Sequence, residues 1–119
     1  FARWAFPFVN SGRSLAGAQV VPESWIASTR ASSPSRAQAF ARSEYAAIFP
    51  GAEYHNKAWI IDPSRGILAM LGIHGQFVYA DPEHELLIVG LSSFPDQANA
   101  LMSASIQTVW SAVHSLTRE

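Results

Sequence analysis

Residues 54–94 decide the fold of this chain, and they read YHNKAWIIDPSRGILAMLGIHGQFVYADPEHELLIVGLSSF. The stretch holds four short apolar runs, each bounded by Pro, Gly, Asp or Ser: residues 58–61, 66–73, 76–80 and 86–91. Short runs of Ile, Val, Leu and aromatic residues between such breakers are typical of consecutive β-strands. We therefore predict an antiparallel meander of three or four strands.

Helices are predicted on both sides of this stretch. Residues 1–10 carry aromatic residues at helical spacing, Pro22 opens a second helix that ends near residues 29–32, and residues 37–49 form an alanine-rich third helix. Residues 97–116 form a final helix, capped by Asp96, with one apolar stripe that must lie on the sheet. The stripe consists of Leu101, Ile106, Val109, Trp110 and Val113. The fold class is therefore α+β, an antiparallel meander sheet packed by N-terminal helices and a C-terminal helix.

Composition excludes several classes of protein. The 119 residues are 49% hydrophobic and 14% charged, which argues against disorder, and the net charge of −1 gives no basic surface for nucleic acid. No apolar run is long enough to span a membrane, and the absence of cysteine rules out thiol chemistry. The high apolar content indicates that another segment normally covers part of the surface, and the absence of an initiator methionine points to a missing upstream part.

The centre of the stretch, Leu71-Gly72-Ile73-His74-Gly75-Gln76, is the first place to look for a site. Two glycines bracket a histidine where one strand should lead into the next. From the residues alone, the glycines fit a bulge where the strand bends as well as they fit a functional turn. His74 and Gln76 fit cleft residues as well as core residues that a neighbour satisfies.

We expect no metal and no cofactor. His55, His74 and His84 do not pair with one another or with an acid at the spacing of helical metal ligands. His84 lies between Glu83 and Glu85, a pattern typical of a solvated turn.

Several motifs, taken in order, resemble one known family. They are GIHGQFVY (72–79) with Asp81-Pro82, ELLIV and LSS (85–93), FARW (1–4), NSGR (10–13), VPESWI (21–26) and YHNKAW (54–59). This pattern resembles the C-terminal part of the serine β-lactamase-like hydrolases, whose fold is shared with penicillin-binding-protein-like transpeptidases. The nylon-oligomer (aminohexanoate-dimer) hydrolase branch, near the class C β-lactamases and their esterase relatives, is the most similar.

The resemblance implies a serine hydrolase that cleaves small amides or esters through an acyl-enzyme. The family's nucleophile lies in a Ser-x-x-Lys motif, but the single lysine here is Lys57 and the residue three before it is Tyr54. We therefore expect residues 1–119 to be the C-terminal portion of one hydrolase domain, inactive alone, with the missing N-terminal part as its partner. Tyr54-His55-Asn56 matches the family's Tyr-x-Asn but lies too close to the third motif, so we expect an edge-strand start with a buried Tyr54.

The family's third motif lines the cleft, and its matching positions here are Met70-Leu71-Gly72 followed by Ile73. The resemblance assigns half of the oxyanion hole to the Ile73 backbone N–H, with Gly72 allowing close approach of substrate and a rigid strand backbone holding the donor. It also gives Met70, Leu71, His74 and Gln76 as substrate-binding residues. The loss of the family's Lys-Thr-Gly favours an esterase or amidase of uncharged or differently charged substrates. The alternative is a non-catalytic α+β binding module whose exposed strands pair with a partner.

Overall fold

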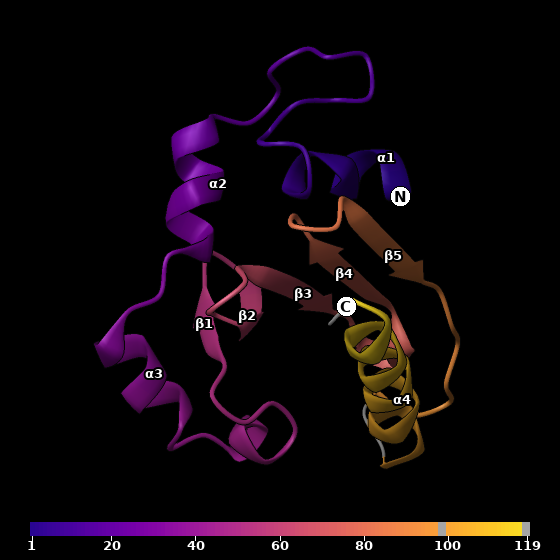
Figure 1. Cartoon of the computed structure of the whole chain (residues 1–119). Coiled ribbons are helices and arrows are strands. Elements are labelled where there is room, and N and C mark those ends of the chain that lie inside the picture. The colour runs from indigo at the N-terminus through magenta and orange to yellow at the C-terminus, as the bar shows by residue number, and fades with distance from the viewer. Residues whose placement is uncertain (98–99, 118–119) are drawn as a thin grey trace.

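The computed structural model describes residues 1–97 and 100–117, and for residues 100–102 it describes the backbone only. Its centre is a five-stranded sheet in the order β1-β2-β3-β4-β5, in which all neighbours are antiparallel (Figure 1). The strands are β1 (Glu53–His55), β2 (Ala58–Asp62), β3 (Ile67–Leu71), β4 (Phe77–Asp81) and β5 (Leu86–Gly90). The predicted meander is confirmed, with one strand more than expected.

Strand β1 is the additional strand, and its polar sequence Glu53-Tyr54-His55 hides it from a hydrophobic pattern. Asn56 and Lys57 both have positive φ, 50° and 65°, which suits the two-residue hairpin turn that joins β1 to β2. The predicted buried Tyr54 is wrong. Its side chain is 46% exposed, because β1 is the edge of the sheet. The Tyr54 ring packs edge-on against that of its cross-strand partner Trp59, with 5.3 Å between the ring centroids.

The two N-terminal helices follow the prediction. Residues 1–10 form α1 (Ala2–Ala5) and a 3-10 turn, η1 (Phe6–Phe8), that accommodates Pro7 near its start. The second helix, α2 (Glu23–Arg30), begins after Pro22 with an acidic residue in its first turn, which complements the helix dipole.

The predicted helix over residues 37–49 is wrong in its bounds. Pro34 starts α3 (Pro34–Phe40) three residues earlier, and a separate 3-10 turn, η2 (Glu44–Ala47), follows. Ser43 separates the two, because its N–H and its hydroxyl both donate to the Phe40 carbonyl at 2.9 and 2.7 Å. A side chain that bonds the helix end in this way competes with continuation of the helix.

Two apolar clusters cover the two faces of the sheet, as the continuous apolar run of β3 predicted. On one face, Ile67 and Ala69 pack with residues from α4 (Ala100–Leu116). On the other face, Leu68 packs with residues from η1 and α2. The contacts from α4 come from Ile106, Val109, Trp110 and Val113, which confirms the predicted stripe for these residues. The side chain of Leu101 and the predicted helix start at 98–99 lie outside the described residues.

The sheet thus runs from β1, beside α3, to β5, beside α1, with α4 packed across its strands (Figure 1). Within the described residues, no helix combines the length and apolar character that a membrane crossing requires.

Candidate functional site

The connection from β3 to β4 is a tight turn built by residues 72–76. Leu71 and Phe77 form the last pair of the two strands, and the Gly72 N–H donates to the Gln76 carbonyl at 2.8 Å. Gly72 is extended, with φ −106° and ψ 156°, and residues Ile73–Gly75 then form a 3-10 turn, η3. The expectation that Ile73 sits on a strand is therefore wrong. The chain leaves the strand after Leu71 because His74 and Gly75 take positive φ, 62° and 89°, and reverse its direction.

Residues 92–97, which follow β5, hold this turn from outside. The His74 N–H donates to the Gln97 carbonyl at 3.1 Å, and the Phe94 N–H donates to the His74 carbonyl at 3.1 Å. The side chains add to these bonds: His74 Nδ1 lies 2.8 Å from the Phe94 carbonyl, and Gln76 Nε2 donates to the Ser92 carbonyl at 2.9 Å. A turn in which His74, a residue with a side chain, has an unfavourable positive φ is thereby kept in one conformation.

Gly75 allows the 92–97 segment to come this close. A Cβ at Gly75 would lie 2.4 Å from Ser92 Oγ and 2.6 Å from the Phe94 ring, and its φ of 89° already favours glycine. The two glycines of the motif therefore have separate roles: Gly75 permits packing, whereas Gly72 borders the site.

Ile73 is the exposed member of the turn. Its side chain is 60% exposed, and among the described residues its backbone N–H has no acceptor. The residue borders a cavity of about 230 Å³ that Gly72 and Leu71 also line. The other lining residues come from η2, β2 and the chain around α4, and are Tyr45, Ile48, Phe49, Trp59, Gln97, Ser103 and Ile106.

Trp59 separates this cavity from a second one. Its ring packs edge-on against Tyr45 at 4.7 Å and against Phe40 at 5.8 Å. Tyr45 and Trp59 also line the second cavity, of about 520 Å³, whose other walls include Arg36 and Tyr54. Two hollows therefore meet at one aromatic pair, on the same side of the sheet as the Ile73 turn.

The structure brings some of the predicted site residues together and separates others. Leu71, Gly72 and Ile73 line the 230 Å³ cavity. Met70 alternates to the other face of β3, where it packs against the cluster around Phe8 and Ile26. Met70 and Gln76 both border a smaller hollow of about 170 Å³ beside Trp4. His74 faces the 92–97 segment.

Trp59 and Tyr45 are cavity residues that sequence reasoning missed. The only available signal was alternation along β2, which places Trp59 on the face opposite Ala58 and Ile60. Tyr45 lies on a 3-10 turn, where no periodic pattern could have placed it.

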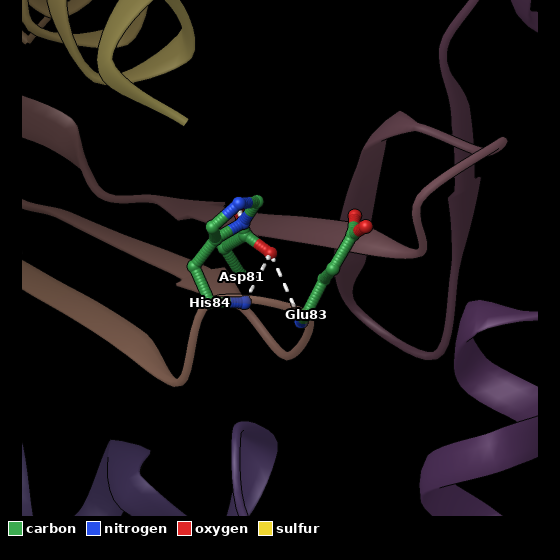
Figure 2. A group of neighbouring side chains, drawn as sticks. All are labelled: Asp81, Glu83 and His84. Atoms are coloured by element: carbon green, nitrogen blue, oxygen red, sulfur yellow. Dashed lines mark hydrogen bonds and ion pairs between the residues drawn. The ribbon is translucent and has the colours of Figure 1, made fainter. Parts of the chain in front are cut away.

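A second polar cluster lies at the β4–β5 turn (Figure 2). Asp81 is fully buried, and one of its carboxylate oxygens accepts from the backbone N–H groups of Glu83 and His84 at 3.1 and 3.3 Å. Its other oxygen lies 2.7 Å from Arg65 Nη2. The predicted solvated turn is therefore anchored by a buried ion pair.

The side chains of Asp81, Glu83 and His84 offer ligand atoms within 4.8 Å of one another. Arg65 already occupies the position of a cation there, because its guanidinium contacts Glu83 at 3.0 Å and His84 Nδ1 at 2.8 Å as well as Asp81. The cluster is therefore better explained as an arginine-centred network than as a metal site.

Electrostatics at this end of the sheet oppose a catalytic tyrosine. Burial and the neighbouring Asp81 carboxylate raise the pKa of Tyr79 to about 12. A phenol with this pKa stays protonated at neutral pH, so Tyr79 is not a general base. Burial also lowers the pKa of Arg65, but the hydrogen bond to Glu83 and the charge of Asp81 outweigh it, so the net pKa lies above its usual range.

No family model matches the chain, but related hydrolases are found among known proteins. Over 80 residues, or 67% of this chain, the sequence is 36% identical to the 6-aminohexanoate-dimer hydrolase of Paenarthrobacter ureafaciens. A solved structure from Bacillus anthracis, assigned as a 6-aminohexanoate-dimer hydrolase, is similar over 95% of this chain, with a TM-score of 0.60 and 26% identity. The matched region spans 20% of the first protein and 27% of the second.

Proposed function

We infer the function from kinship: this chain is a nylon-oligomer-hydrolase-like segment, as its motifs indicated and as both relatives confirm. The names of these relatives indicate a hydrolase of the aminohexanoate-dimer hydrolase type. The β-lactamase-like packing of the complete domain, and the place of residues 1–119 as its C-terminal portion, are part of the proposal.

The proposed activity is hydrolysis of an amide or ester through an acyl-enzyme. A serine oxygen supplied from outside this chain attacks the carbonyl carbon, the amine or alcohol leaves with a proton, and water then releases the acid. The charge that develops on the carbonyl oxygen needs hydrogen-bond donors already in place. Residues 1–119 contain no Ser-x-x-Lys, so the chain contributes to this site without supplying its nucleophile.

One observation carries the proposal: Ile73 borders a cavity, and its backbone N–H has no acceptor among the residues that the structure describes. Because no protein acceptor among the described residues engages this N–H, it can donate to a substrate oxygen. Gly72 precedes Ile73, and a Cβ at this position would lie 3.1 Å from Gln76 Oε1, so the missing side chain makes room for Gln76 within the turn. We assign half of the oxyanion hole to this N–H.

The cavity also favours a substrate class. The described residues that line it include six large apolar side chains and no Asp, Glu, Lys or Arg. An uncharged acyl group, aliphatic or aromatic, would bury apolar surface there, whereas an ammonium or carboxylate would lose its hydration without gaining a partner from this chain. The proposed substrates are therefore small amides or esters whose acyl chain is apolar beside the scissile carbonyl, and a terminal ammonium, as in an aminohexanoyl group, would take its counter-charge from residues other than those that line this cavity.

The test joins this chain to a hydrolase segment that carries Ser-x-x-Lys, and this joined polypeptide is assayed with a p-nitrophenyl ester. The variant Ile73→Pro removes the N–H at a position where proline is tolerated, because Ile73 begins a 3-10 turn and Gly72 is already extended. We expect kcat to fall by about 10²- to 10³-fold. Ile73→Ala keeps the N–H and serves as the matched control. Equal activity of Ile73→Pro and wild type would refute the oxyanion assignment.

The alternative, a non-catalytic α+β binding module, is favoured by a separate surface. Trp4, Val20 and Trp25 are exposed along a groove of about 670 Å³ on the α1–α2 side of the sheet. If the joined polypeptide folds, retains its serine and fails to hydrolyse any ester in a panel of acyl lengths, this alternative replaces the hydrolase proposal.

A further inference from the structure

His74 bonds to both backbone groups of a single distant residue. Its carbonyl accepts from the Phe94 N–H at 3.1 Å, and its side-chain Nδ1 lies 2.8 Å from the Phe94 carbonyl. The pair resembles a β-bridge in which the imidazole takes the place of the backbone N–H of His74. That backbone N–H donates to the Gln97 carbonyl instead. Ser92 adds a bond from its hydroxyl to the same His74 carbonyl at 3.1 Å.

These bonds constrain the peptide that carries the Ile73 N–H. The preceding peptide is fixed by the bond from the Gly72 N–H to Gln76 at 2.8 Å. The following peptide is fixed by the bond from the His74 N–H to Gln97 at 3.1 Å. The Ile73 N–H thus lies between two bonded peptides, and its direction depends on His74 staying in the left-handed conformation, with φ 62°. That conformation is unfavourable for a residue with a side chain unless other bonds hold it.

The protonation of His74 follows from the same geometry. A carbonyl oxygen only accepts hydrogen bonds, so Nδ1 carries the proton that it shares with Phe94. The Nδ1–H is present in the neutral Nδ1–H tautomer and in the imidazolium alike. The bond to Phe94 is therefore compatible with either form, whereas a histidine that exchanges protons with substrate would work in one form only.

We propose that His74 is a positioning residue, which holds the Ile73 N–H towards the cavity by bonding both backbone groups of Phe94. This inference rests on the proposed function of Ile73 as an oxyanion donor. It assigns His74 no contact with substrate, and it makes the 92–97 segment part of the support of the site.

Two substitutions at His74 distinguish the effect of its side-chain hydrogen-bond donor from the effect of its left-handed backbone conformation. Asparagine tolerates left-handed φ and places an N–H donor at the position of Nδ1, whereas glycine tolerates the same φ but has no donor. In the joined polypeptide, we expect His74→Asn to keep kcat within about threefold of wild type and His74→Gly to lower it by about tenfold to a hundredfold. We expect KM to stay within about twofold for both, because the interaction lost acts on the transition state.

Each result decides between named roles. A His74→Gly variant with wild-type kcat would overturn the positioning role and leave the proposed function standing. Equal loss in both variants, together with loss of one limb of the pH–rate profile, would also overturn it, because that pattern indicates acid–base catalysis by His74. Absence of hydrolysis by the wild-type joined polypeptide would overturn the proposed function and this inference together.

Two further measurements complete the test, one a control for misfolding and the other a direct observation of the His74 tautomer. His55→Asn, on the edge strand β1, is the matched control for a histidine change away from the turn. Nitrogen-15 NMR of the wild-type imidazole reports the tautomer directly. We expect a protonated Nδ1 at His74. A neutral ring protonated at Nε2 instead would overturn the proposal.

Discussion

Glu53 offers a sharp test of how the sheet is attached to the helices before it. Its carboxylate is fully buried on β1 and accepts hydrogen bonds from the segment that links α2 to α3 and from α3 itself. The Ser33 N–H lies 3.0 and 2.9 Å from its two oxygens, Arg36 Nε lies 3.1 Å from one of them, and the Ser32 hydroxyl bonds the other. We predict that Glu53→Gln destabilises the fold strongly, although it preserves shape.

The expected loss in the free energy of unfolding follows from the hydrogen bonds that the glutamine amide cannot accept. Glutamine replaces one acceptor oxygen with an NH₂ group, which then faces a donor, and it leaves Arg36 without its counter-charge. Losing a buried charged hydrogen bond and leaving a partner unsatisfied costs about 2–3 kcal/mol of the free energy of unfolding. With a denaturant slope of about 1–2 kcal/mol per molar, the urea midpoint should fall by roughly 1–2 M.

The assay is urea unfolding followed by tryptophan fluorescence, since Trp59 packs against Phe40 of α3. Burial alone would raise the pKa of Glu53, but the hydrogen bonds from Ser32, Ser33 and Arg36 lower it below its usual value of 4.5. A lowered folded-state pKa contributes stability that is present above pH 4.5 and lost as the pH falls through the folded-state pKa. The difference between wild type and variant should therefore be full at pH 7 and shrink below pH 4.5.

Glu44→Gln is the matched control, because Glu44 is exposed in η2, and it should change stability by less than about 0.5 kcal/mol. If Glu53→Gln unfolds at the same urea concentration as wild type at pH 7, the network around Glu53 does not stabilise the fold and the reasoning fails.

Two further predictions concern the far side of the sheet. Asp81→Asn removes the buried partner of Arg65 at 2.7 Å, and it should lower the free energy of unfolding by about 2–4 kcal/mol in the same urea assay; a change below about 0.5 kcal/mol would contradict the buried ion pair. Gly90→Ala would place a Cβ 2.0 Å from Phe77 Cε1, and calorimetry should find a loss of about 1–3 kcal/mol. An unchanged melting temperature would mean that the Phe77 ring moves aside freely.

The sequence was most informative where burial alone sets the pattern. Strands β2 to β5 are apolar and bounded by turn residues, so their existence and order were predictable. An edge-strand start at Tyr54 was expected, but β1 as a separate strand was not, because Glu53 is buried through partners that lie 17 to 21 residues away. The bounds of α3 were wrong because a single serine side chain, Ser43, bonds the helix end and alanine content carries no information about this.

The candidate site, too, was predictable only where local sequence determines its structure. Local sequence placed Gly72 and Ile73 at the end of a strand, which the structure has at Leu71. It could not give the turn that follows, because the conformation of His74 depends on Phe94 and Gln97, about twenty residues later. The cavity beside Ile73 also draws on several elements, including β2, η2 and α4, whose convergence is a property of the folded chain.

The bonds between the η3 turn and residues 92–97 also bear on the order of folding. Each strand pairs with its sequence neighbour, so the hairpins can form early from local contacts. The turn between β3 and β4 contains two residues at positive φ and lacks its stabilising partners until residues 92–97 dock. We therefore expect the sheet to assemble while this turn still samples several conformations, and the turn to reach its final conformation only in a late step. Mutations at Phe94 should then accelerate unfolding while leaving the rate of sheet formation nearly unchanged.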